Sequence, residues 1–343
     1  MALTEAVAST PVTRAVAERL TLQKPLPMRM VHLYPPFDRY MTPVPDKVLT
    51  TPSMMSENER VFLYNIVRKY YTGGGRIVDA GIFLGGSTNC FAEGVRQNSR
   101  REHIVGKWPK PILSLERAVV SNTMPAFFAR HGIGEGYEAG DSFAPLLESY
   151  VKGCEDLVEL RVGDIMECGD IADRIEILFL DVLKNPHIAA YAIKQYFPKL
   201  IPGRSIVIQQ DYFFEGLPFI KTYQEFFGAQ FEYIGEVGSS AIFRCIARVE
   251  KAAIDKVVGG LPTEAQLRLA STALQRSNDP TRRFMMAMSK TLLIHELDGP
   301  DAARAYLKFA EAEFAAEITP TPPNRLAGPL KALHKLVGTG KEA

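Results

Sequence analysis

The sequence has few cysteines and no long apolar run, and each of these absences removes a class of protein. Its 343 residues include four cysteines, and no two of them are spaced as Cys-x-x-Cys. This argues against a zinc ribbon or a disulfide framework and is typical of a reducing cytosol. No apolar stretch reaches the ~18 residues of a membrane-spanning helix. The first residues also lack the charged and then apolar pattern of a signal peptide. We therefore expect a cytoplasmic protein with no membrane partner.

The sequence also has almost no net charge. Lys and Arg together number 40 and Asp and Glu 39, which leaves a net charge of +1 at pH 7. No overall electrostatic field would attract a polyanion, so we expect no nucleic-acid partner. The composition that is present, 46% apolar and 23% charged residues, is ordinary for a globular protein of this length and can bury a core.

Three regions follow one another along the chain. Residues 1–55 combine a short amphipathic helix over 1–22 with an arm rich in proline and aromatic residues over 24–52. Because proline disfavours helices and central strands, we expect the arm to be extended, with its aromatic side chains packed on the body or lining a substrate mouth. Residues 56–249 form the main domain. Residues 250–343 read as a helical extension, either a cap or a surface for homo-oligomerisation.

The main domain alternates strand-like and helix-like stretches. Ser56 and Glu59 have capping-box spacing and begin the first helix. Five apolar stretches separated by helices predict parallel strands covered on both faces, and a turn near Gly238 joins two more as a hairpin. The strand candidates are 76–80, 111–116, 157–162, 175–182, 205–211, 231–237 and 240–247. The predicted fold is therefore α/β, with one seven-stranded sheet of five parallel strands plus an antiparallel hairpin, flanked by helices.

The first of these strands runs into a glycine-rich turn, VDAGIFLGGST, over residues 78–88. Ile82 and Phe83 stand where a dinucleotide fingerprint needs its second glycine. The Gly-Lys-Ser or Gly-Lys-Thr of a nucleoside-triphosphate loop is missing as well. The turn therefore suits neither of these nucleotide classes.

The same turn suits a smaller ligand with an amino acid at one end. Asp79 would hold the ammonium group of such a ligand, and Gly81 and Gly85 would let the backbone approach it. Ser87 and the N-terminus of the following helix would take the carboxylate. A purely structural turn after a buried strand is the alternative.

These residues resemble the first motif of class I S-adenosylmethionine-dependent methyltransferases. Glu116 ends the second strand, where that family places the acid that holds both ribose hydroxyls, and Gly163 to Ile165 fall at the family's adenine pocket. The resemblance covers roughly residues 56 to 247. It implies a Rossmann-like methyltransferase sheet with S-adenosylmethionine as the cofactor. The implied cofactor-binding residues are Asp79, Gly81, Phe83, Gly85, Ser87, Glu116, Gly163, Asp164, Ile165 and Asp181.

In this family, methyl transfer takes place at the carboxyl ends of strands four and five. The spacing Asp181-x-x-Lys184 resembles metal-dependent O-methyltransferases of the catechol and caffeoyl-CoA type, whose aspartate holds magnesium and whose lysine is the base. A metal site of Asp181, Gln210 and Asp211 would supply only oxygen donors, which suits Mg²⁺. The acid and the amide of the second pair are, however, reversed relative to that family. The macrocin O-methyltransferase group, which acts on sugar hydroxyls, is a second relative.

Two catalytic mechanisms remain open at this point. With a metal, Lys184 would take the proton of an acceptor hydroxyl whose pKa the ion lowers. Without a metal, His187 is the better base, oriented by Asp211. Each residue also has a structural interpretation, Lys184 as an ion-pair partner of Asp181 and His187 as a first-turn residue of a helix.

The function that these residues favour is S-adenosylmethionine-dependent methylation of a hydroxyl on a small molecule or a sugar. One alternative is a catalytically silent protein that uses the methyltransferase fold as a scaffold for a partner. A nicotinamide-dependent oxidoreductase is disfavoured by the spacing of the glycines.

Overall fold

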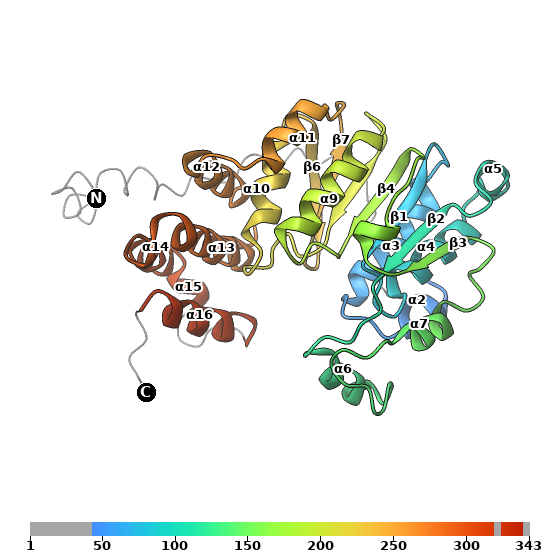
Figure 1. The fold of residues 1–343 in the computed structure, drawn as a ribbon, viewed down its shortest axis with the longest axis horizontal. Coiled ribbons are helices and arrows are strands. Elements are labelled where there is room, and N and C mark those ends of the chain that lie inside the picture. Colours follow the sequence, from blue (N-terminus) through green and yellow to red (C-terminus); the bar gives the residue numbers. More distant parts are fainter. Residues whose placement is uncertain (1–42, 319–323, 339–343) are drawn as a thin grey trace. The chain divides into compact units, whose positions relative to one another are not determined.

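The computed structural model describes residues 43–318 and 324–338. It contains a seven-stranded sheet with the order β3-β2-β1-β4-β5-β7-β6 (Figure 1). Strands β1 to β5 pair in parallel, and β7 lies antiparallel between β5 and β6. The strands are β1 (Arg76–Ala80), β2 (Ile112–Glu116), β3 (Val158–Val162), β4 (Ile175–Leu180), β5 (Ile206–Gln209), β6 (Phe231–Val237) and β7 (Ser240–Cys245). The predicted α/β fold, with one seven-stranded sheet of five parallel strands plus an antiparallel hairpin, is confirmed.

Helices flank this sheet and continue beyond it, which confirms the predicted helical extension. Those that precede the last strand in the chain are α2 (Asp46–Thr50), α3 (Glu57–Tyr70), α4 (Gly86–Arg96), α5 (Arg101–Lys107), α6 (Met124–His131), α7 (Ala144–Val151), α8 (Ile165–Cys168), α9 (Pro186–Tyr196), the 3-10 helix η1 (Phe197–Lys199) and α10 (Pro218–Phe226). Those that follow the last strand are α11 (Lys251–Val258), α12 (Thr263–Ala273), α13 (Pro280–Asp298), α14 (Pro300–Glu313), α15 (Ala315–Ile318) and α16 (Asn324–Leu336).

The two central strands are buried along their whole length, as their continuous apolar sequences require. Every residue of β1 and β4 is buried, because helices cover both faces of a parallel sheet. On one face, α3 and α4 contribute to a single apolar cluster with the strands. The rings of Phe91 in α4 and Phe179 in β4 meet edge to face there, with centroids 6.1 Å apart.

The predicted capping box is present and does more than begin α3. The Ser56 amide donates to Glu59 Oε2 at 2.9 Å, and the Glu59 amide donates to Ser56 Oγ at 3.3 Å. The other carboxylate oxygen, Glu59 Oε1, accepts the Ser239 amide at 3.0 Å. Glu59 therefore ties the start of α3 to the turn between β6 and β7.

The described residues divide into two compact units. One holds the sheet and comprises residues 43–210 and 230–254, and the other comprises 211–229, 255–318 and 324–338. In the second unit, the buried Glu225 carboxylate of α10 accepts three hydrogen bonds from Arg276, at 2.6 to 3.2 Å. The segment that directly follows β5 thus belongs with the C-terminal helices.

One prediction about the N-terminal region is wrong where the structure can test it. The arm over 24–52 was expected to be extended, yet Asp46–Thr50 form α2. Its stability comes from burial, since the Val48 side chain is fully buried in the core beside α3 and α4. The predicted helix over 1–22 and the arm up to residue 42 lie outside the described residues.

None of the helices in residues 43–318 and 324–338 combines the length and the apolar character that crossing a bilayer requires.

Candidate functional site

A cleft of about 420 Å³ opens where the parallel strands end. Gly81 follows β1, Glu116 ends β2, and Asp181 follows β4, so the carboxyl edge of the sheet forms its floor. This is the position at which open α/β sheets bind ligands. The predicted site residues that line the cleft are Gly81, Phe83, Glu116, Gly163, Asp164, Ile165, Asp181 and Lys184.

The glycine turn needs its glycines for two separate reasons. Gly81 has a φ of +90° and Gly85 a φ of +82°, values that residues with a β-carbon adopt at a cost. A β-carbon on Gly81 would also lie 2.8 Å from the carbonyl carbon of Asp181. Phe83 has a φ of +50° without being glycine. Such strain is concentrated at functional sites.

Asp79 lies behind this turn and not on the wall of the cleft. Its side chain is completely buried, and Oδ2 accepts hydrogen bonds from the hydroxyls of Ser87 at 3.0 Å and Thr88 at 2.7 Å. Its second oxygen, Oδ1, is buried without a hydrogen-bond partner. Burial raises the pKa of the Asp79 carboxyl to about 7, against the effect of the two hydroxyls. The Ser87 hydroxyl therefore donates to Asp79. The prediction that it faces the cleft and takes the carboxylate of the ligand is not met.

Glu116 connects the turn to the end of β2. Its carboxylate accepts the Phe83 amide at 2.7 Å and the Ala118 amide at 3.1 Å. Burial raises the pKa of this carboxyl. The residue is thus held by backbone donors with its carboxylate at the cleft.

The predicted adenine-pocket residues lie beside Glu116. The Gly163 amide donates to the Glu116 carbonyl at 2.9 Å. Asp164 accepts the Met166 amide at 2.8 Å and so caps α8, while Ile165 is buried. The start of α8 therefore forms part of the wall of the cleft.

Two of the three predicted catalytic residues meet at the cleft. The Lys184 Nζ lies 2.8 Å from Asp181 Oδ1, and both residues line the cleft. His187 stands in the first turn of α9, is exposed, and is not among the lining residues. The structure thus places Lys184 at the site and leaves His187 outside it.

Gln210, one of the predicted metal ligands, is hydrogen-bonded within the protein through both ends of its side-chain amide. Gln210 Nε2 donates to Ser239 Oγ at 2.6 Å, and Gln210 Oε1 accepts the Ser240 hydroxyl. The amide oxygen is therefore committed to the β6–β7 turn. Within residues 43–318 and 324–338, no group of three or more His, Cys, Asp or Glu is arranged to hold a metal ion.

Several lining residues carried no motif. Some of them are adjacent in sequence to a predicted site residue and could have been predicted from that position. Met54 and Met124 come from distant segments, and no sequence motif marks them. The additional lining residues are Met54, Leu115, Arg117, Val119, Ser121, Met124, Val182, Asn185 and Ile188.

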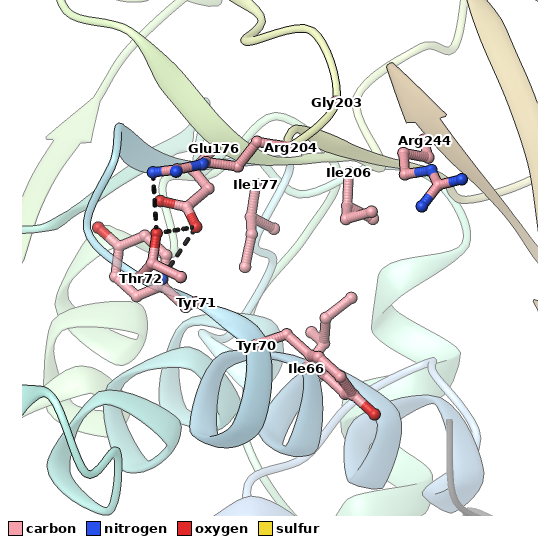
Figure 2. A pocket seen from close by; sticks show the side chains of 10 residues that line it. All are labelled: Ile66, Tyr70, Tyr71, Thr72, Glu176, Ile177, Gly203, Arg204, Ile206 and Arg244. Atoms are coloured by element: carbon pink, nitrogen blue, oxygen red, sulfur yellow. Dashed lines mark hydrogen bonds between the residues drawn. The ribbon is translucent and has the colours of Figure 1, made fainter. Parts of the chain in front are cut away.

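A second cavity, of about 190 Å³, lies at the opposite, amino-terminal edge of the sheet. Figure 2 shows Thr72 hydrogen-bonded to both Glu176 and Arg204, with Ile177 and Ile206 on the strands beside them. Glu176 accepts both the amide and the hydroxyl of Thr72, at 2.9 and 2.8 Å. Because its polar groups bond one another and no motif residue lines it, the larger cleft is the candidate site.

Comparison with known proteins adds two structural likenesses. No protein-family model and no curated protein matches the sequence. An O-methyltransferase from Bacillus cereus, solved in complex with SAH, is 18% identical over 60% of this chain and 92% of its own, with a TM-score of 0.38. A proposed O-methyltransferase from Klebsiella pneumoniae is 16% identical over 71% of this chain and 94% of its own, with a TM-score of 0.35.

Proposed function

We propose that the protein binds S-adenosylmethionine in the larger cleft and transfers its methyl group to a hydroxyl of a small molecule or a sugar. Glu116 is the observation that carries this proposal. A carboxylate has about four acceptor positions, and Glu116 accepts two backbone amides. The remaining capacity, at the wall of the cleft, suits a pair of neighbouring hydroxyls such as those of a ribose.

The glycine turn supports the amino-acid end of the same ligand. Asp79 Oδ1 is a buried oxygen without a partner, and a carboxylate in that position favours a nearby cation. Gly81 lets the backbone of the turn come within contact of the strand that carries Asp181. The residues present therefore fit S-adenosylmethionine.

Lys184 is the proposed general base, and Asp181 positions it. When bound, S-adenosylmethionine would supply a methyl group on a positively charged sulfur. Lys184 would take the proton that the acceptor hydroxyl loses as its oxygen attacks that methyl group, a role that requires the uncharged amine. Asp181, 2.8 Å away, holds the side chain at the cleft. The proposed proton transfer uses no metal ion.

Calorimetric titration with S-adenosylhomocysteine tests the proposal. We expect wild-type protein to bind it in the micromolar range or tighter, and Glu116→Gln to bind it about tenfold more weakly, since a hydrogen bond to a charged group contributes about 1.5–3 kcal/mol. Glu102→Gln, an exposed change on α5, is the matched control. Folded wild-type protein that produces no heat with this ligand refutes the proposal.

Homo-oligomerisation through the helical extension, and a domain boundary near residue 250, remain predictions.

A further inference from the structure

After β2 the chain leaves the sheet, and the two ends of the excursion lie side by side. We call its residues 119–142 the flap. Val119 and Ser142 form an isolated antiparallel bridge at its base. Next to it, the Val120 amide donates to the Asp141 carbonyl at 2.8 Å. Between these ends stand α6 and a loop rich in glycine, and Figure 1 shows α6 projecting from the sheet near α7. The flap is therefore fastened at its base and built around one helix.

The inner face of the flap rests on the glycine turn. The Phe83 ring stacks on Phe128 of α6, with centroids 6.0 Å apart and planes at 6°. The same ring meets Phe127 edge to face at 5.2 Å and Phe143 at 5.7 Å. Phe128 is buried, whereas Phe127 is only half-buried. Such ring pairs favour one docked position of α6 over the turn.

The flap also contributes to the cleft itself. Ser121 and Met124 line it, together with Phe83 and Glu116. The Phe83 amide donates to Glu116 Oε2 at 2.7 Å, so one residue carries both a bond to the proposed ribose-binding acid and the ring on which the flap rests. A ligand that settles at Glu116 would therefore stabilise the docked position of the flap.

We propose that the flap closes over the bound cofactor and that Met124 contacts this ligand. The contact between Phe83 and Phe127 holds the flap in its docked position. This inference rests on the proposed function, because the ligand at Glu116 is taken to be the methyl donor. The outer surface of α6 carries the exposed Arg130 and His131. Loss of the ring contacts on the inner face would let the last turn of α6 unfold and would make the backbone at Arg130 accessible.

Limited trypsin digestion tests the flap directly, because Arg130 is the single Lys or Arg between Arg117 and Lys152. Trypsin needs an extended backbone at the bond that it cuts, and the docked helix does not present one after Arg130. With S-adenosylhomocysteine at about ten times its Kd, cleavage after Arg130 should slow about tenfold. Cleavage after the exposed Arg101 of α5 is the internal reference and should keep its rate.

Phe127→Ala supplies the second arm. It should speed cleavage after Arg130 and weaken S-adenosylhomocysteine about threefold to tenfold, the range that one aromatic contact spans. Phe219→Ala is the matched control, since Phe219 is also half-buried and pairs with Tyr223 on α10 at 6.2 Å. It should change neither quantity.

The outcomes separate this inference from the function on which it rests. Wild-type protein that binds S-adenosylhomocysteine while Arg130 is cut at the unliganded rate overturns the flap and leaves the proposed function standing. Normal affinity in Phe127→Ala overturns the positioning contact. Wild-type protein that binds no S-adenosylhomocysteine overturns both.

Discussion

Replacing Asp79 by asparagine should stabilise the sheet unit at neutral pH while weakening ligand binding. Asp79 is completely buried, and its pKa of about 7 in place of the ordinary 3.8 comes first from burial and then from the nearby carboxylates of Asp181 and Glu116. Each pH unit corresponds to about 1.4 kcal/mol, so the ionised carboxylate costs roughly 4 kcal/mol in the folded state. Asparagine keeps the size and an accepting oxygen for the hydroxyls of Ser87 and Thr88, but it removes the charge.

The sign of the pH dependence follows from the direction of the shift. The folded state holds the Asp79 proton to a higher pH than the unfolded state, so stability falls as the pH rises from about 4 to about 7 and is flat above that. Between pH 5 and pH 8 the wild type should lose about 2–3 kcal/mol relative to Asp79→Asn. Because the two proteins share every other titrating group, the difference between their free energies of unfolding at each pH reports the titration of Asp79.

Urea unfolding followed by tryptophan fluorescence measures this difference. Trp108 is the sole tryptophan of the chain and lies in the sheet unit, where its Nε1 donates to the Gly73 carbonyl at 2.9 Å. Asp46→Asn, an exposed change in α2, should leave the profile unchanged. A difference between wild type and Asp79→Asn that is the same at pH 5 and pH 8 would refute the reasoning. The variant should also bind S-adenosylhomocysteine more weakly, because it lacks the negative charge that favours the ammonium group of the ligand.

Two further predictions concern the C-terminal helices and catalysis. Arg276→Ala should destabilise the second unit by about 3–5 kcal/mol, because it leaves the buried Glu225 carboxylate without its cation. Urea unfolding followed by circular dichroism at 222 nm measures the free energy of unfolding. A loss of stability no larger than that caused by Arg248→Ala, a change at an exposed residue, would contradict the prediction. Lys184→Ala should slow transfer of a labelled methyl group to an acceptor about 10²- to 10⁴-fold, equally with and without EDTA, at nearly unchanged cofactor affinity. His187→Ala should be mild, and the reverse ranking of these two variants would move the base to His187.

The sheet was predictable because its signals are local. The buried strands β1 and β4 have continuous apolar sequences, and the Ser56–Glu59 capping box marks the start of α3 at a fixed spacing. The glycine turn was predictable for the same reason, since Gly81 has a conformation and a close neighbour that exclude a side chain.

The direction of single side chains was not predictable, since it depends on contacts distant in the chain. Gln210 turns toward Ser239 and Ser240 instead of the cleft, and spacing alone cannot reveal this. Met124 reaches the cleft through packing of the flap. Asp46–Thr50 form a helix that is only five residues long, and such a helix depends on tertiary burial more than on local propensity.

The most direct test of the account is a parallel calorimetric titration of wild-type protein with S-adenosylhomocysteine and with NADH. The larger cleft combines the Glu116 carboxylate with a turn in which Ile82 and Phe83 stand at the place of a dinucleotide glycine. We therefore predict saturable binding of S-adenosylhomocysteine and no binding of NADH. Folded protein that binds NADH and does not bind S-adenosylhomocysteine would contradict the account.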